Sequence, residues 1–332
     1  MESLQEHGPD YLYYTALSLG LFQISVWAAR TLALLGRTFF GVKATTARYG
    51  EDSWAVITGS TDGIGKAAAI YLARQGFNIV LVSRTLAKLQ TVAKEVEAEA
   101  TKAGKKIKTK VISNDWTKNF DAETHTSMYQ QHLKDLDISI LINNVGMADP
   151  GDFTDLTEQQ IHNMITCNVY STALMTNQII HSFKRRFEKN NKIRSLLINT
   201  SAMAAIVPCP FVSVYSATKI FGDFLLNGLS IELAQYNVDC SAWRAAGVQT
   251  KIIGSDGDIP PKEFGMATPE EYVTAGLSKC ASGVHSGYYF HEFMHLVWTN
   301  INDIAPVELC MGFFNNMLRG MLAKEMAKKK KA

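Results

Sequence analysis

The sequence predicts an α/β protein with a doubly wound parallel sheet in one large domain, preceded by a transmembrane helix and followed by an apolar C-terminal extension. A glycine-rich turn follows a short apolar run within Trp54–Gly65. Further apolar runs alternate with helical patterns, as expected of βα units. An uncharged stretch lies near the N-terminus. A chain of 332 residues buries a full core, and its net charge of +2 does not indicate a nucleic acid partner.

The uncharged stretch covers residues 11–29, YLYYTALSLGLFQISVWAA, and approaches the roughly 20 residues that cross a bilayer as a helix. We therefore expect a membrane anchor over residues 11–36. A buried helix or a cleaved signal peptide is the alternative, because Gly20, Gln23 and Ser25 weaken the pattern. Acidic residues precede the stretch and basic residues follow it, so the positive-inside rule predicts that the rest of the chain faces the cytosol. The flanking charges are Glu2, Glu6 and Asp10 before it and Arg30, Arg37, Lys43 and Arg48 after it.

The remaining boundaries follow from this anchor. We expect a tail over 1–10, a linker over 37–50, the folded domain over 51–290 and an apolar C-terminal segment over 291–332. The chain ends in AKKKKA, with Lys329 and Lys330 fourth and third from the end. This ending resembles the dilysine retrieval signal of endoplasmic reticulum membrane proteins; a solvated charge run is the alternative. With the anchor, it predicts the endoplasmic reticulum membrane as the location.

The stretch WAVITGSTDGIG, Trp54–Gly65, is a predicted strand and glycine-rich turn, and KAAAIYLARQG continues it as a helix that ends at Gly76. Glycines let the backbone approach a pyrophosphate, and the helix N-terminus favours its charge. A second predicted strand over 77–84 completes a Rossmann-type βαβ unit. The expected cofactor contacts are Gly59, Ser60, Thr61, Asp62, Gly63, Ile64 and Gly65.

Arg84 ends the second predicted strand, where an NAD site usually has an acidic residue. A guanidinium there suits a 2′-phosphate, so the sequence favours NADPH; a solvated arginine is the alternative. Two later strands end in polar residues, and ligands bind at that sheet edge. Asp115 and Asn143 are therefore expected cofactor contacts. Helical patterns near 85–103, 119–134 and 157–188 supply the crossovers.

A second uncharged stretch, 195–218, contains Pro208 and Pro210 and is predicted to be a buried strand and an active-site loop. Tyr215 and Lys219 follow it, four residues apart on one face of a predicted helix. An ammonium beside a phenol favours the phenolate and is expected to lower its pKa from about 10. Tyr215 is then a proton donor for a ketone that receives a hydride. An ordinary helix face is the alternative.

Three motifs, TGSTDGIG at 58–65, NNVG at 143–146 and YSATK at 215–219, resemble the signature of the short-chain dehydrogenase/reductase family over about residues 51–290. The spellings TGSTDGIGK, NNVGM and VYSATK resemble its group of microsomal very-long-chain 3-oxoacyl-CoA reductases and 17β-hydroxysteroid dehydrogenases type 12. The resemblance implies a catalytic domain in which Lys219 also holds the nicotinamide ribose and Asn168 serves a water-mediated proton relay. It also implies a homodimer.

The serine that hydrogen-bonds the substrate carbonyl in this family usually lies thirteen residues before the tyrosine, where this chain has Ala202. Ser201 is one residue earlier, and a regular strand would turn its side chain to the opposite face. A bulge after the strand would re-aim it, and on that basis Ser201 is an expected catalytic residue. The family's Pro-Gly beside the nicotinamide is also replaced, by Ala245-Ala246-Gly247, while Thr250 remains an expected cofactor contact.

HEFMH, His291–His295, matches the HExxH zinc motif. It follows SGYYF, residues 286–290, which is predicted to be the last strand, and no ligand cluster accompanies it. We expect no metal there. The apolar segment from Phe290 to about Leu322 is interpreted as a substrate lid or a membrane-surface helix.

These patterns predict NADPH-dependent reduction of a lipid ketone. The resemblance favours reduction of 3-oxoacyl-CoA to 3-hydroxyacyl-CoA in very-long-chain fatty-acid elongation, with partners in an elongation complex. A steroid ketone is the alternative substrate. A catalytically impaired NADPH-binding subunit is the alternative from another functional class, because of Ala202 and the replaced Pro-Gly.

Overall fold

A seven-stranded sheet forms the centre of the protein in the computed structural model, which describes residues 8–118, 122–252, 258–280 and 283–329. All neighbouring strands are parallel, in the order β3-β2-β1-β4-β5-β6-β7. The strands are β1 (Trp54–Thr58), β2 (Asn78–Ser83), β3 (Thr109–Ser113), β4 (Ile138–Asn143), β5 (Ser195–Ala202), β6 (Val238–Ala245) and β7 (Gly283–His285). The chain crosses from β3 to β4 past β1, so the order reverses between β1 and β4. Ligands bind at such a switch point, outside the carboxyl ends of the strands.

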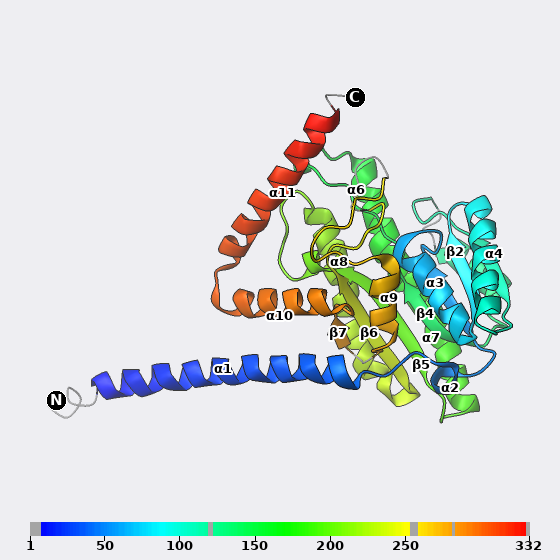
Figure 1. Cartoon of the computed structure of the whole chain (residues 1–332), viewed down its shortest axis with the longest axis horizontal. Helices are drawn as coiled ribbons and strands as arrows, with labels where there is room; N and C mark the ends of the chain where they lie inside the picture. Colours follow the sequence, from blue (N-terminus) through cyan, green and yellow to red (C-terminus); the bar gives the residue numbers. More distant parts are fainter. Residues whose placement is uncertain (1–7, 119–121, 253–257, 281–282, 330–332) are drawn as a thin grey trace.

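Helices cover both faces of the sheet (Figure 1), which confirms the predicted doubly wound class. One face packs α3, α4 and α9, and the other packs α5, α7 and α8. The helices of the domain are α2 (Thr46–Tyr49), α3 (Gly63–Gln75), α4 (Leu86–Lys102), α5 (Ala122–His132), α6 (Glu158–Ile165), α7 (Ser171–Lys189), α8 (Ser213–Glu232) and α9 (Pro269–Leu277). Part of the predicted 119–134 helix, residues 119–121, lies outside the described residues.

Two predicted elements, one helix and one strand, need correction. The pattern at 157–188 was expected to form one crossover, but a π-helical turn at Thr166–Tyr170 separates α6 from α7. The stretch SGYYF is not the last strand. Gly287 adopts a left-handed φ of 70° and ends the extended chain, so β7 lies earlier and Tyr289 begins α10 (Tyr289–Ile304).

Alternation along the strands creates the two cores. Ala55 and Ile57 of β1 point into the core beneath α3 and α4, whereas Val56 points into the opposite core. All six residues of β2 and of β4 are buried, as expected of strands covered on both faces. This packing fixes the strand ends that carry the candidate site.

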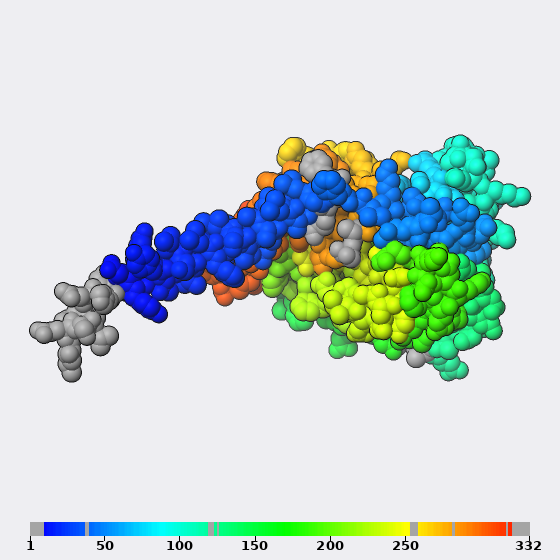
Figure 2. Space-filling view, turned by 90° about the horizontal axis from the view of Figure 1, so that it is seen from below, coloured from blue at the N-terminus to red at the C-terminus, as the bar shows by residue number. Residues whose placement is uncertain are grey.

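The predicted N-terminal helix is present as α1 (Gly8–Phe40), 33 residues long. Its segment Asp10–Gly36 has a mean hydropathy of 1.4, and none of its most apolar window is buried. Figure 2 shows α1 protruding beyond the rest of the molecule as a single rod. In the described part of the chain it is the one helix long and apolar enough to cross a membrane.

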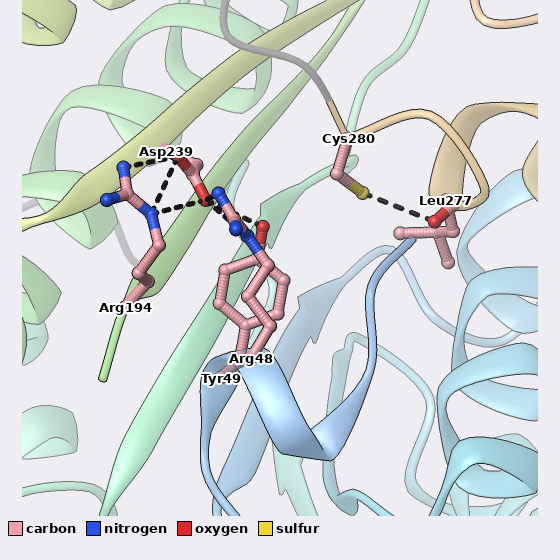
Figure 3. A network of polar contacts seen from close by, with 6 residues as sticks. All are labelled: Arg48, Tyr49, Arg194, Asp239, Leu277 and Cys280. Carbon is pink, nitrogen blue, oxygen red and sulfur yellow. Dashed lines mark hydrogen bonds and ion pairs between the residues drawn. The ribbon is translucent and has the colours of Figure 1, made fainter. Parts of the chain in front are cut away.

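The residues after α1 attach it firmly to the domain. Cys280 and Ala44 form backbone hydrogen bonds with Val42 and Leu277, at 2.6 and 2.8 Å. Figure 3 shows the neighbouring polar network around Asp239, which is 6% exposed. Its carboxylate accepts hydrogen bonds from Arg48, Arg194 and Tyr49 at 2.9, 2.6 and 2.9 Å. Burial raises the pKa of Tyr49 far above its usual range, so Tyr49 stays a donor.

The C-terminal segment forms α10 and α11 (Val307–Lys329). α10 extends from the domain on the side from which α1 leaves it, and α11 turns back toward the domain (Figure 1), where Arg319 lies over the Phe211 ring at 5.4 Å from its centre. α10 lies beside the second half of α1. Arg30 of α1 pairs with Asp303 and donates to Asn300 at 3.1 Å. Lys330 of the proposed dilysine signal lies outside the described residues.

Candidate active site

The glycine-rich loop between β1 and α3 requires glycine. Gly59 and Gly63 have φ values of 63° and 51°, which L side chains rarely adopt. A β-carbon on Gly65 would lie 2.3 Å from the Gly59 carbonyl oxygen and 2.5 Å from Nδ2 of Asn144. Asp62 caps α3 by accepting from the Gly63 N–H at 2.8 Å. The result is a tight loop that leads into a helix N-terminus, which fits a dinucleotide pyrophosphate.

The other expected residues of this loop point inward or pack against it. Ser60 is fully buried and its hydroxyl faces the Val82 carbonyl at 3.4 Å. The hydroxyls of Thr61 and Ser83 lie 3.1 Å apart, which ties the loop to β2. Ile64 packs on the core of the α3 face. These contacts set the loop conformation and leave cofactor binding chiefly to backbone N–H groups.

Thr250 packs against the glycine-rich loop. A β-carbon on Gly63 would lie 2.9 Å from Cγ2 of Thr250. The next residue, Lys251, pairs with Asp62 at 2.7 Å. This ion pair lowers the pKa of Asp62 against the opposing effect of burial. Sequence reasoning identified Thr250 but missed Lys251, because the pair forms only when the chain after β6 folds over the glycine-rich loop.

The polar ends of β2 and β3 lie at the same sheet edge. Arg84 follows β2 with an exposed side chain. Asp115 follows β3, and its carboxylate accepts from the backbone N–H of Thr117 at 3.2 Å and from its hydroxyl at 2.8 Å. The structure therefore places both expected residues at the edge where the predicted cofactor binds.

The two asparagines of the NNVG motif at the end of β4 make contacts that differ from the expectation. Asn143 is 3% exposed and its amide donates to Thr176 of α7 at 2.7 Å, so its side chain supports the sheet. The neighbouring Asn144 holds the glycine-rich loop instead, donating to the carbonyls of Thr58 and Gly59 at 3.1 and 3.2 Å. The sequence pointed to Asn143 as the contact. It could not show which asparagine faces the loop, because side-chain direction depends on strand register.

Asn168 and Lys219 meet at Gly146. A β-carbon on Gly146 would lie 3.1 Å from Nζ of Lys219 and 3.4 Å from Oδ1 of Asn168. Asn168 sits in the π-helical turn, a feature often found at functional sites. Its amide group bonds both backbone groups of Met147, at 2.8 and 2.9 Å. The NNVG and YSATK motifs therefore meet Asn168 at Gly146.

Tyr215 and Lys219 lie in the first turns of α8, with Nζ of Lys219 5.6 Å from the centre of the Tyr215 ring. Lys219 is 7% exposed, and burial lowers its pKa to about 8. Burial also raises the pKa of Tyr215 to about 12. Contrary to the expected lowering, the pKa of the phenol is raised, because burial disfavours the charged phenolate. A phenol with this pKa is protonated at neutral pH.

The expected bulge at the end of β5 is not formed. β5 pairs with β6 residue by residue up to Ala202 opposite Ala245, without a register shift. Ser201 is 2% exposed, and its hydroxyl faces the Lys219 carbonyl of α8 at 3.4 Å. Its side chain therefore points into the packing between β5 and α8, not in the direction of Ala202. The re-aiming expected for Ser201 is wrong, since a regular strand turns neighbouring side chains to opposite faces.

Beneath Lys219 lies a buried polar chain that sequence reasoning missed. Asp223, one turn further along α8 and 1% exposed, accepts from Nε of Arg244 at 2.8 Å. Arg244 also contacts Nε2 of His295 at 2.8 Å. Burial raises the pKa of Asp223, and the Arg244 guanidinium and the Ser201 hydroxyl oppose that rise. The signal available in the sequence was the four-residue spacing of Lys219 and Asp223.

The HEFMH residues lie on α10 but serve internal contacts. The Glu292 carboxylate accepts from the backbone N–H groups of Ser286 and Gly287 at 2.8 and 3.2 Å. His291 lies between the Ala246 N–H and the Gly265 carbonyl, at 3.4 and 3.2 Å. Burial lowers the pKa of His291 to about 4, which keeps the ring neutral. Within the described residues, no group of three His, Cys, Asp or Glu side chains could hold a metal ion.

Comparison with known proteins identifies this arrangement. The family described as short chain dehydrogenase matches residues 53–258, which include the glycine-rich loop, Asn168, Tyr215 and Lys219. The chain belongs to the short-chain dehydrogenase family. It is therefore an oxidoreductase, and the glycine cradle at the switch point fits the nicotinamide cofactor of this family.

Relatives in this family extend over most of the chain. The chain is 32% identical over 295 residues to a very-long-chain 3-oxoacyl-CoA reductase of Scheffersomyces stipitis, covering 86% of this chain and 83% of that protein. It is 36% identical over 255 residues to the 17-beta-hydroxysteroid dehydrogenase type 3 of Mus musculus, covering 75% and 76%. A solved short-chain dehydrogenase from Sphingobium yanoikuyae in complex with NADPH is similar with a TM-score of 0.59 and 26% identity, covering 70% of this chain and 87% of that one.

Proposed function

We propose that this protein is an NADPH-dependent reductase of a long lipid ketone, with a 3-oxoacyl-CoA as its substrate and the 3-hydroxyacyl-CoA as its product. The convergence of Asn168, Lys219 and Tyr215 beside the glycine-rich loop is the observation on which this proposal depends. The 3-oxoacyl-CoA reductase of Scheffersomyces stipitis, similar over 86% of the chain, supports the substrate class.

The residues of the chain divide the work as follows. NADPH held at the glycine-rich loop would supply the hydride that the carbonyl carbon receives. Tyr215, protonated at neutral pH because its pKa is about 12, donates its hydroxyl proton to the carbonyl oxygen. The ammonium of Lys219 lies next to the ring and stabilises the phenolate that remains. Asn168 contributes to returning a proton to Tyr215, and Lys219 also holds the nicotinamide ribose.

The cofactor preference is proposed from Arg84. This exposed guanidinium stands after β2, where a bidentate contact to a 2′-phosphate is favourable. The glycine-rich loop, residues 59–65, is proposed to bind the pyrophosphate, with Asp115 toward the adenine side and Thr250 toward the nicotinamide side. Asn143 supports this site from within the sheet, through its bond to Thr176.

The location is proposed from α1 and the chain ends. The uncharged stretch 11–29 spans the endoplasmic reticulum membrane, and the basic residues after it place the domain in the cytosol. Lys329 and Lys330 are then readable as a retrieval signal. A homodimer and contacts with fatty-acid elongation enzymes are further proposals from the family, and light scattering of the purified protein tests the dimer.

Two other functions have specific support. A steroid ketone substrate is supported by the 36% identity to the mouse 17-beta-hydroxysteroid dehydrogenase type 3. An impaired NADPH-binding subunit is supported by Ala202, since loss of one oxyanion donor typically costs about 100- to 1000-fold in turnover.

The deciding experiment measures NADPH oxidation by detergent-solubilised full-length protein with a long-chain 3-oxoacyl-CoA and, separately, with a 17-ketosteroid. Turnover of the acyl-CoA that Tyr215→Phe abolishes, with NADPH binding retained, supports the reductase. Turnover of the steroid alone supports the second function. NADPH binding without turnover of either substrate contradicts the reductase proposal and supports the impaired NADPH-binding subunit.

A further inference from the structure

Exposed apolar side chains gather where α10 meets α11. Ile304 ends α10 and is 63% exposed, and Leu309 in the first turn of α11 is 68% exposed. Val307 and Phe313 are 39% and 54% exposed. We call Ile304–Phe313 the α10–α11 corner. Scattered apolar side chains are normal on a surface, but four of them within ten residues at one helical corner make it a candidate contact.

The corner is a fixed part of the structure. Trp298 of α10 packs on Phe313 and Phe314 of α11, with ring centres 5.1 and 4.8 Å apart. Cys310 is 2% exposed in the same turn. This packing against Trp298 fixes the turn between the two helices, while the other side of Phe313 stays exposed.

Contacts with α1 set the level of the corner along the membrane helix. Asp303 pairs with Arg30, the first charged residue after the uncharged stretch, and accepts from Gln23 at 3.4 Å. Gln23 and Arg30 are seven residues apart, or about 10 Å along a helix. Asp303 therefore lies at the last part of the uncharged stretch. Ile304, the next residue and the first of the corner, lies at nearly the same level.

We propose that the α10–α11 corner inserts into the interface of the bilayer that α1 spans, as a second membrane contact. This inference rests on the membrane anchor in the proposed function. Gln23 lies about 10 Å inside Arg30 along α1, which is comparable to the depth of about 5–10 Å to which apolar groups enter the boundary of headgroups and acyl chains. Arg30 neutralises Asp303, and the exposed Glu308 has a side chain that can extend toward water.

Two attachment points would fix the orientation of the domain on the membrane, because a single helix leaves rotation about its axis free. α10 runs from the corner back to the candidate site, where His295 contacts Arg244 and His291 contacts the turn after β6. The inserted corner therefore holds the candidate site at a constant height and direction above the bilayer from which a long acyl chain would arrive.

The test uses full-length protein in lipid nanodiscs with a single fluorophore. All five native cysteines are buried, so a new surface cysteine is labelled selectively with an environment-sensitive dye. The probes are Leu309→Cys on the corner, Leu21→Cys on α1 and Ile231→Cys, which replaces an 80% exposed residue of α8 as the matched control. Lipids that carry a quencher on the acyl chain report contact with the hydrocarbon.

The expected result is quenching of the probes at positions 21 and 309 by at least about threefold over the probe at 231, together with a blue shift of the dye at 309. Quenching at 21 without quenching at 309 overturns the proposed corner contact and leaves the anchor intact. A blue shift at 309 without lipid quenching also overturns it and points to a protein contact. Absence of quenching at 21 contradicts the proposed membrane anchor. This outcome does not depend on whether the protein oxidises NADPH.

Discussion

The ammonium of Lys219 donates a hydrogen bond to the carbonyl oxygen of Thr200 at 2.8 Å, joining α8 to the end of β5. This bond fixes the charge beside Tyr215, and the carboxylate of Asp223 one turn away raises the pKa of Lys219 against the larger lowering effect of burial. The charge of Lys219 is thus set by burial and by groups from three elements: Thr200 of β5, Cys167 of the π-helical turn and Asp223 of α8.

We expect reductase activity to fall above about pH 8. The pKa of Lys219 is lowered to about 8, so its ammonium is present below that pH and lost above it. Asp223→Asn removes a negative charge that favours the ammonium, so the alkaline limit of kcat/KM should move to lower pH. Glu188→Gln, an exposed change on α7, is the control and should leave the profile unchanged. An unmoved profile in Asp223→Asn would show that the Asp223 carboxylate does not set the pKa of Lys219.

Restoring the family's serine should increase turnover. Ala202→Ser places a hydroxyl on the face opposite that of Ser201, and one oxyanion donor is worth about 100- to 1000-fold. Steady-state kcat with the preferred substrate measures the effect. A kcat equal to or below that of the wild type would show that this chain polarises its substrate by other groups.

Ser201→Ala should change kcat by less than about tenfold, because the Ser201 hydroxyl faces the Lys219 carbonyl instead of the substrate side. The Ser201 hydroxyl lowers the pKa of Asp223 and so favours its charged form. Its loss should therefore move the alkaline limit of kcat/KM to lower pH, as Asp223→Asn does. A loss of about 100-fold at constant pH dependence would mean that Ser201 acts on the substrate after all.

Arg84→Ala should raise the KM for NADPH by about 10- to 100-fold and leave the KM for NADH unchanged. A charge-assisted hydrogen bond contributes about 1.5–3 kcal/mol, and each 1.4 kcal/mol is a factor of ten. Lys88→Ala removes another exposed cation from the first turn of α4 and serves as the control. Equal losses with both cofactors would argue for a structural effect at the end of β2.

The HEFMH residues should matter for stability and not for metal binding. A chelator is expected to leave NADPH oxidation unchanged. Glu292→Ala removes the acceptor of two backbone N–H groups and should lower the free energy of unfolding by about 1–3 kcal/mol, measured by urea denaturation. Glu292→Gln keeps an oxygen acceptor and should recover much of that loss. Inactivation by the chelator would revive the zinc interpretation.

The sequence by itself determined the fold class, the family and the position of most site residues. Glycine at 59, 63 and 65 is a local requirement of the backbone, and the four-residue spacing of Tyr215 and Lys219 is a property of any helix. Strand runs such as Ile138–Asn143 are apolar because both faces are covered. Local patterns of this kind can be read without knowing what packs against them.

The direction of side chains and the balance of charges were decided only by the tertiary structure. Ser201 faces α8 because β5 stays in register with β6, and no local signal distinguishes a regular strand end from a bulge. The pKa of Tyr215 rises because neighbouring elements exclude water, an effect that depends on distant parts of the chain. The Arg30 pair with Asp303 joins residues 273 apart, so the packing of α10 on α1 had no local signature.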